Sequence, residues 1–400
     1  MTVAVSTPSS EARPGWLWSP RWDLIFISLS VVLVAVPYAA YLGLVALGPT
    51  LQPLFARLGT DAEGFSRNLV NMSIALFIGG PHMYATLTRT ALDRRFMGKH
   101  RRMAFSALAI PMVVVALAFL NLTLLLTIFF FWASIHVLHQ IIYVTELYNT
   151  RKGVPGLRAD LNTSSGLNLR ANLSLGSGLF SRLADYAVVL TALYPLAAWK
   201  IVTGRFQIGT NDIGAVVGQF LPVGPWMVWL VGGIFGLALV AWLAKTVYDW
   251  RQGTLHVPKT VFIAVTVIAS FSVPALGNLD TAFQGMNVWH SFQYMALTWI
   301  LIHIQQERAQ LGDSPFVSRL ARTGSSRRYY GFLMAITAAD VALAAVLFVV
   351  FRYALQDPFD LAFDRAYYIA VLSFLWMHYY FDHYLFTQPD VIAAPARAGG

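Results

Sequence analysis

Ten long apolar stretches, separated by short polar segments, dominate the pattern of the chain. Each is roughly 18–25 residues long, which is the length a helix needs to cross the hydrocarbon core of a bilayer. A tight turn near Asn121 must separate the third stretch from the fourth, and the mixed stretch 201–223 is expected to be a loop with interfacial character. The pattern therefore predicts ten transmembrane helices, over about 22–47, 68–90, 103–121, 122–147, 179–200, 224–248, 259–278, 284–306, 330–354 and 363–388.

Basic residues alternate between the two sides of this arrangement. Loops on one side hold the groups Arg94–Arg102, Arg151–Arg170 and Arg308–Arg328, whereas loops on the other side hold scattered basic residues. Because cytoplasmic loops carry the excess of Lys and Arg, both termini are predicted to be cytoplasmic.

The predicted fold class is all-α: a polytopic integral membrane helix bundle of about ten transmembrane helices, located in a bacterial inner (plasma) membrane. A single transmembrane domain is expected over 22–388, with disordered tails over 1–21 and 389–400. The Gly/Ser/Asn-rich loop 149–178 is interpreted as a flexible cytoplasmic connection rather than a lid.

Composition supports this class and narrows the chemistry. The chain has 400 residues, of which 57% are hydrophobic and 12% charged, whereas soluble domains carry about 25% charged residues. The net charge of +9 is explained by the basic loops, so membrane lipid is an expected partner and nucleic acid is not. The absence of cysteine excludes thiolate metal sites and covalent haem attachment, so a metal would need His, Asp, Glu or Tyr ligands.

Histidines are the most informative polar residues in the apolar stretches, where each polar group is costly and is usually functional or paired. Within Phe129–Leu147, His136 and His139 are three residues apart and share one helix face. Counting at about 1.5 Å per residue from the predicted cytoplasmic ends, these two lie at the same depth as His82 and His378. The same count puts His290 higher in the membrane, and puts His303 and His383 closer to the cytoplasm.

Neutral imidazole is a common ligand for iron, copper and zinc, so these histidines predict a metal or haem site. The alternative for any one of them is a hydrogen bond to a carbonyl or to a neighbouring helix. His256 and His100 lie in predicted loops and are interpreted as surface residues. The candidate metal ligands are His82, His136, His139, His290, His378 and His383.

Several neighbours of these histidines could complete a site. Asp382 is four residues after His378 and could accept its ring N–H or bind metal itself, whereas His383 is five residues after and could join the same metal only if the helix bulges. Asp382 and Tyr294 are the candidate catalytic residues. Glu146 and Glu307 are either ligands of a two-metal centre or charges at helix ends, and the second interpretation is favoured. The segment Gly79–Pro81 should interrupt or kink the helix just before His82.

Four short motifs around these residues resemble, in order, those of the Brp/Blh family of membrane-bound β-carotene dioxygenases. They read GGPHMYAT (Gly79–Thr86), ASIHVLHQ (Ala133–Gln140), VWHSFQY (Val288–Tyr294) and WMHYYFD (Trp376–Asp382). The resemblance implies an all-helical membrane fold that cleaves a polyene with oxygen, and it implies iron ligation by His82, His136, His290 and His378.

The chain departs from that family at several motif positions. Tyr294 stands where the family has a second histidine, and His139 could substitute for that ligand. The acidic residues expected after the first two histidines are absent, with Thr86 after the first. The last motif lacks the family's proline before His378, and this chain is longer by several segments.

Three functions remain open at this point. The leading prediction is a non-haem iron oxygenase that uses O₂ for oxidative cleavage, desaturation or hydroxylation of a lipophilic substrate such as a carotenoid or lipid, with copper and zinc as alternative metals. The second is an electron-transfer protein with haem between pairs of histidines. The third is a proton-coupled transporter that uses Asp185 and Asp340, although no repeated halves or matched broken helices are visible. The sequence makes no prediction of oligomeric state.

Overall fold

The computed structural model is built from helices, as the apolar stretches predict. It describes residues 15–50, 52–53, 61–151, 169–208, 211–277, 279–307, 311, 314–322 and 324–387. The first part of the chain forms α1 (Pro20–Trp22), η1 (Asp23–Ser28), η2 (Leu29–Val34), α2 (Ala35–Ala46), α4 (Ala62–Ile74), η3 (Ala75–Gly79), α5 (Gly80–Ala85), η4 (Thr86–Thr88), α6 (Arg94–Lys99), α7 (Arg101–Ala107), α8 (Ala109–Leu120) and α9 (Leu122–Arg151).

The second part continues in the same manner after α9. Its elements are α11 (Leu169–Thr191), α12 (Tyr194–Val202), β1 (Gln207–Ile208), β2 (Asn211–Asp212), α13 (Ile213–Phe220), α14 (Pro225–Arg251), α15 (Val257–Ser272), η5 (Val273–Ala275), α16 (Leu279–Glu307), α17 (Pro315–Arg322), α18 (Ser326–Val349), η6 (Val350–Ala354) and α19 (Phe359–Leu385). The two short strands pair antiparallel, with Gln207 opposite Asp212.

Seven helices of the described chain are long and apolar enough to cross a membrane: Pro20–Ala46, Arg101–Leu120, Leu122–Asn149, Gly178–Val202, Pro225–Arg251, Val257–Ala275 and Ser326–Ala354. They coincide with seven of the ten predicted stretches. The other three, 68–90, 284–306 and 363–388, are also helical, in α4–η4, α16 and α19. These three carry the polar residues around His82, His290 and His378, which lowers their hydropathy relative to the other seven.

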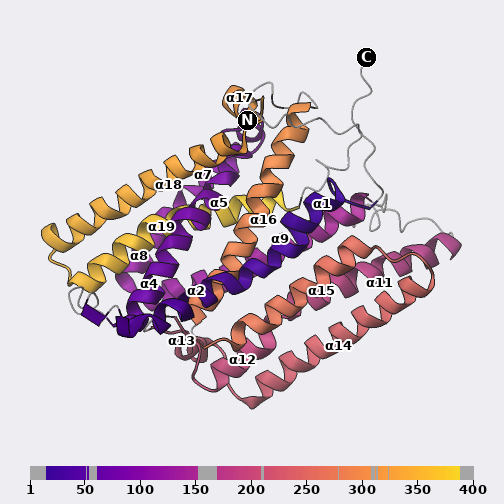
Figure 1. Cartoon of the computed structure of the whole chain (residues 1–400), viewed down its shortest axis with the longest axis horizontal. Helices are drawn as coiled ribbons and strands as arrows, with labels where there is room; N and C mark the ends of the chain where they lie inside the picture. Colours follow the sequence, from indigo (N-terminus) through magenta and orange to yellow (C-terminus); the bar gives the residue numbers. More distant parts are fainter. Residues whose placement is uncertain are drawn as a thin grey trace.

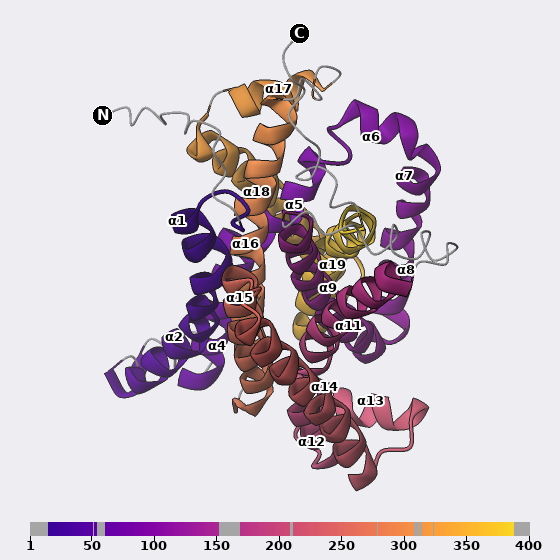
Figure 2. The same ribbon diagram turned by 90° about the vertical axis from the view of Figure 1, so that its right-hand side faces the viewer.

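The helices divide into two groups, with α16 between them. Figure 1 shows α11, α14 and α15 side by side at one end of the molecule, with α8, α18 and α19 toward the other end and α16 running between the groups. The short helices α6 and α7 project beyond α5 in the view of Figure 2. Phe96 of α6 packs against Phe381 and Tyr384 of α19, so this projection contacts the C-terminal end of α19.

Two glycines allow the helices that carry histidines to approach their neighbours closely. A Cβ at Gly285 of α16 would lie 2.1 Å from the backbone oxygen of Val34, and a Cβ at Gly80 of α5 would lie 2.3 Å from Cγ2 of Thr337. Real Cβ atoms do not approach other atoms so closely, so the contact with backbone at Gly285 requires glycine, whereas at Gly80 the Thr337 side chain would have to shift. The contacts hold α16 against η2 and α5 against α18.

Several local predictions can be compared directly with the structure. The tight turn at Asn121 is confirmed, since α8 ends at Leu120, α9 begins at Leu122, and Asn121 Oδ1 accepts a hydrogen bond from Leu124 N. The prediction of a loop over 201–223 is wrong in its second half, where Asp212 caps α13 by accepting a hydrogen bond from the Ala215 N–H.

The predicted tails fall largely outside the described residues. The prediction of a loop over 149–178 is wrong at both ends, because α9 runs to Arg151 and α11 begins at Leu169, and the stretch 152–168 lies outside the described residues. The described chain begins within the predicted N-terminal tail, at residue 15, and this part is folded. Leu17 is buried, and its backbone N–H donates to Asp23 Oδ2 at 2.7 Å. Apolar burial and the Asp23 carboxylate together hold this segment against the bundle.

Candidate metal centre

Four histidines from four separate helices converge inside the bundle. They are His82 of α5, His136 of α9, His290 of α16 and His378 of α19, and all four are buried. Each offers one ring nitrogen, and these nitrogens lie within 4.8 Å of one another, so the group could hold a metal ion. The ring of His82 lies 4.4 Å from that of His378 and 4.5 Å from that of His290, measured between centroids. We call these residues the four-histidine cluster.

The backbone before His82 is irregular in the way that the segment Gly79–Pro81 predicts. A π-helical turn over Ala75–Gly79 comes directly before α5, and Pro81, which has no backbone N–H to donate, stands at the second position of α5. Single π-helical turns are frequent at functional sites because they change which face of a helix a side chain occupies. Here the next residue after the proline is His82.

Six ring nitrogens of the four-histidine cluster are buried without a hydrogen-bond partner among the described residues. They are both nitrogens of His82, both of His290, Nε2 of His136 and Nε2 of His378. The carbonyl of Gly79 lies near the His82 ring but does not meet hydrogen-bond geometry. Buried polar groups are normally paired, because an unpaired one costs about 1–3 kcal/mol. A metal ion that accepts one lone pair from each histidine would remove that cost at four of the six nitrogens, and the second nitrogens of His82 and His290 would carry the ring protons.

The nitrogens are also close to the spacing that one ion requires. A metal–imidazole bond is about 2.0–2.1 Å long, so two nitrogens on opposite sides of an ion are about 4.2 Å apart and adjacent ones are closer. The observed limit of 4.8 Å is slightly wider. Side-chain movements of well under an ångström for each ring would close the site around an ion.

A hydroxyl and a carboxylate fix the orientation of one of the four rings. Asp382 Oδ1 accepts hydrogen bonds from Thr86 Oγ1 at 2.9 Å and from the Tyr294 hydroxyl at 2.6 Å. The Thr86 hydroxyl has one proton and donates it to Asp382. In its 2.5 Å contact with His378 Nδ1, Oγ1 must therefore accept, and the ring N–H donates. This assignment puts the lone pair of His378 on Nε2, which is the nitrogen without a partner.

The second carboxylate oxygen of Asp382 faces the cluster. Asp382 Oδ2 lies 3.5 Å from His378 Nδ1 and 4.0 Å from His136 Nε2, and it has no hydrogen-bond partner among the described residues. Asp382 was predicted to accept a hydrogen bond from the His378 ring N–H. In the structure Thr86 accepts that hydrogen bond and in turn donates to Asp382. Tyr294 lies beside the cluster, with its ring 5.0 Å from that of His82, and it contacts the network through its hydroxyl.

Thr86 and Arg89 belong to this site and were not identified from the sequence as site residues. The guanidinium of Arg89 is buried and interacts electrostatically with Asp382, Tyr294 and Tyr143. A cation at this position balances the Asp382 carboxylate inside the bundle. Helical spacing could have identified them in the sequence. Thr86 is four residues and Arg89 seven residues after His82, which puts all three on one face of a helix.

His139 and His383 do not join the four-histidine cluster but face each other, with ring centroids 5.0 Å apart. We call them the histidine pair. His139 is half-buried and His383 is exposed. The bulge that would bring His383 to the same ion as His378 is not present, because α19 is a regular α-helix from Phe359 to Leu385.

The depth count from the sequence is wrong for His290, which lies within the cluster rather than above it. The helices that carry the four histidines end at different heights, so distance from a helix end does not measure depth. His303 is half-buried one helix turn from Trp299, its Nδ1 2.7 Å from the Trp299 carbonyl oxygen. His256 and His100 are also half-buried rather than fully exposed; His256 caps α15, and His100 contacts the Tyr384 hydroxyl.

Glu146 lies in a second polar region, between α9, α11, α14 and α15, and Glu307 is the last residue of α16. Glu146 accepts hydrogen bonds from Asn149 and Tyr186, and its Oε1 lies 3.8 Å from Arg182 Nε. Nearby, Asp185 accepts from Lys245 at 2.9 Å and from Lys259 at 2.7 Å. We call Glu146, Arg182, Asp185, Lys245 and Lys259 the charged cluster.

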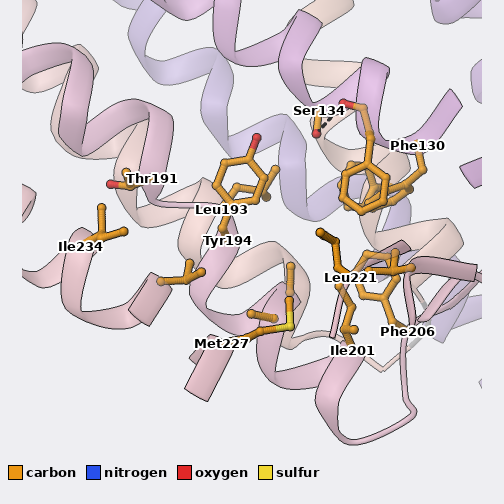
Figure 3. Close-up of a pocket in the computed structure, with 16 residues that line it drawn as sticks. Phe130, Ser134, Thr191, Leu193, Tyr194, Ile201, Phe206, Leu221, Met227 and Ile234 are labelled. Atoms are coloured by element: carbon orange, nitrogen blue, oxygen red, sulfur yellow. Dashed lines mark hydrogen bonds between the residues drawn. The ribbon is translucent and has the colours of Figure 1, made fainter. Parts of the chain in front are cut away.

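A separate apolar cavity of about 280 Å³ lies on another side of α9 (Figure 3). Its lining includes Phe130, Ser134, Tyr194 and Phe206. The Ser134 hydroxyl donates to the Phe131 carbonyl, as Figure 3 shows, so this hydroxyl is already satisfied. Ser134 is two residues before His136, which places it about 200° around the helix. The cavity therefore does not open onto the four-histidine cluster.

No family model matches the chain, and no curated protein and no solved structure matches it significantly.

Proposed function

We propose that the four-histidine cluster holds one transition-metal ion and that the protein is a membrane-embedded oxidative metalloenzyme acting with O₂ on a lipophilic substrate such as a carotenoid or lipid. The observation that carries this proposal is the set of six buried ring nitrogens without hydrogen-bond partners. Without a bound ion, burying four imidazoles from four helices in an apolar interior would reduce the stability of the fold.

Non-haem iron is the proposed metal. Imidazole suits iron, copper and zinc alike, and the resemblance of the four motifs to the Brp/Blh family favours iron among them. Bound iron would supply the activation of O₂. The residues of the chain would orient and supply protons: Thr86 fixes the His378 ring, and Asp382 with Tyr294 can exchange a proton at Asp382 Oδ1.

A lipophilic substrate is proposed because aromatic rings connect the cluster to the side of the bundle. The ring of Tyr379 stacks on His136 at 4.2 Å, and Trp132 contacts both Tyr379 and Trp376. Trp132 is half-buried, so this row of rings reaches from the cluster toward the protein surface. Such a surface suits a polyene or acyl chain that enters from the bilayer.

Two observations argue against the alternative functions. The pair His82 and His136 has ring centroids 6.4 Å apart, but the rings of His290 and His378 each lie within 4.9 Å of both and occupy the space that a porphyrin between them would need. Asp185, one of the two candidates for proton transport, is held by two lysines and is therefore poorly placed to carry protons, whereas this argument does not apply to Asp340, whose Oδ1 is buried without a hydrogen-bond partner among the described residues.

We also propose that α4–η4, α16 and α19 cross the membrane, so that the chain has ten spans and two cytoplasmic termini in a bacterial inner membrane. At about 1.5 Å per residue, α16 and α19 are roughly 40 Å long and can cross a bilayer. Fusion of a periplasm-active and a cytoplasm-active reporter to each terminus tests this topology. Activity of the periplasmic reporter at one terminus would require an odd number of spans.

Metal content and the visible spectrum of the purified protein test the proposal. We expect close to one iron per chain and no Soret band. A content below about 0.3 iron, copper or zinc per chain would overturn the metal site, and a Soret band would indicate haem instead. Stoichiometric zinc with no O₂ consumption would contradict the oxidative part while leaving the ligands in place.

A further inference from the structure

We infer that the histidine pair, His139 and His383, captures the metal ion from the aqueous phase and delivers it to the four-histidine cluster past the ring of Phe386. This inference rests on the proposed metal site. It assigns a second, transient metal site to the molecule, with two imidazole ligands and the remaining positions open to water.

The pair has the properties of a capture site. Its two rings face each other with centroids 5.0 Å apart at an interplanar angle of 54°. His383 is exposed and His139 is half-buried, and His383 is two residues before the C-terminal end of α19, so the pair lies at the surface near a helix end, where we infer that water reaches it. Neither ring makes a hydrogen bond to any described residue, which leaves the ring nitrogens available to a metal. Two imidazoles without a carboxylate bind a divalent ion weakly enough to release it.

Phe386 connects the pair to the cluster. Its ring lies 5.3 Å from His139 and 5.6 Å from His136, so one side chain contacts a member of each group. Phe386 is itself buried and also packs against Tyr143 and Tyr294. Phe386 therefore lies beside both the more exposed ligands and the buried ones, and the inferred route passes its ring.

The cluster needs such a route because its four histidines are buried, with exposures of 1–3%. An ion that leaves water for an apolar interior loses its hydration in one step unless ligands replace the waters in stages. His139 stands three residues after His136 on α9, and His383 five residues after His378 on α19. The same two helices thus carry ligands at both stages.

The test measures the rate of metal uptake rather than activity. Metal-free protein in detergent is mixed anaerobically with ferrous ions, stopped with a chelator at successive times, desalted and measured for iron. We expect the double variant His139→Ala/His383→Ala to load more slowly by about tenfold or more, the scale on which groups around a metal site alter its binding, and to reach the same final iron content. His303→Ala is the matched control, since His303 is also half-buried but lies apart from both groups, and it should load like the wild type.

A second variant tests the route independently. Phe386→Ala keeps both sets of ligands and removes the ring between them, so it should load faster and lose its iron to a chelator faster than the wild type. Equal loading of the double variant and the wild type would overturn the inference while leaving the proposed function intact. A lower final iron content in the double variant would make the pair permanent ligands and would also overturn it. A wild-type protein that takes up no iron, copper or zinc would remove the proposed function, and the inference with it.

Discussion

The molecule contains two polar regions within its apolar helix bundle, and they differ in whether their buried polar groups have partners in the protein. In the charged cluster, each carboxylate has cationic or hydrogen-bonding partners: Asp185 contacts two lysines, and Lys259 also donates to Asn149 at 2.9 Å. In the four-histidine cluster, six ring nitrogens have no partner among the described residues. Both regions lie within an apolar helix bundle, where unpaired polar groups are expensive.

The difference separates a structural role from a binding role. The charged cluster holds α11, α14 and α15 together and is complete without any further group. The four-histidine cluster instead brings one ring nitrogen of each histidine within 4.8 Å of the others, and the lone pairs of these nitrogens are ones that a metal ion would accept. The same reasoning removes Asp185 from the functional candidates and keeps the histidines, although both looked functional as isolated polar residues in apolar sequence.

Asp185→Ala should produce the largest loss of stability, because it leaves the ammonium groups of Lys245 and Lys259 buried without their shared carboxylate. Removing one partner of a buried ion pair costs about 3–5 kcal/mol in free energy of unfolding. Denaturant unfolding in detergent measures this, and iron per folded chain should not change. Asp249→Ala is the control, since Asp249 lies 3.6 Å from Lys245 at the rim of the cluster and its side chain is 25% exposed; its cost should stay below about 1 kcal/mol. Equal losses in the two variants would contradict a special role for Asp185.

His136→Ala and His378→Ala should have the reverse effect. Each removes a proposed ligand, so metal affinity should fall by more than about 100-fold, which is roughly 2.7 kcal/mol. The metal-free protein should lose less stability than Asp185→Ala, since neither substitution leaves a buried charge unpaired: Nε2 of both histidines has no hydrogen-bond partner in the described chain, and His378→Ala loses only the hydrogen bond from Nδ1 to Thr86. Titration with ferrous ions and unfolding of the metal-free protein measure the two quantities. Unchanged iron binding in both variants would show that the ligand assignment is wrong, and His256→Ala should bind iron like the wild type.

The sequence predicted most of the helices because length and apolar content alone determine whether a stretch can cross a bilayer. It also selected the four residues of the cluster, through the order of four short motifs around His82, His136, His290 and His378. The sequence could not show which histidines meet in space. His139 lies in the same apolar stretch as His136, and only the direction of its side chain from α9 brings it to His383 instead of the cluster. The depth predicted for His290 was wrong because it was counted from a helix end, and the helices that carry the four histidines end at different heights.

The polar network beside the histidines was harder to foresee for a physical reason. Thr86 was interpreted only as the absence of an expected acid. Its role depends on Asp382, which is 296 residues away in sequence and adjacent in space. Contacts of this kind depend on how η4 and α19 pack, and no local pattern encodes that packing.

Thr86→Val should weaken metal binding without emptying the site. Valine keeps the shape of threonine but lacks the hydroxyl that accepts from His378 Nδ1 and donates to Asp382 Oδ1. Loss of such a partner typically lowers metal affinity by about 10–100-fold. Thr86→Ser retains the hydroxyl and should bind iron nearly as the wild type does. Equal affinities of the valine and serine variants would show that the hydroxyl does not orient the ring.

Gly80→Ala should have the smallest effect and tests whether helix packing places the cluster. The new Cβ would lie 2.3 Å from Cγ2 and 2.7 Å from Oγ1 of Thr337, so α5 or the threonine must move. Because a side chain can yield more easily than backbone, the expected cost is about 1 kcal/mol, and His82, two residues further on α5, should bind iron more weakly. Gly232→Ala in α14, where a Cβ meets nothing within 4 Å, is the control and should not destabilise the protein. The decisive comparison is the double variant Gly80→Ala/Thr337→Ala, which removes both obstructing atoms. Recovery of iron affinity in that variant, measured against Gly80→Ala alone, would attribute the loss to the α5–α18 contact; no recovery would mean that Gly80 matters for the backbone geometry of the π-helical turn instead.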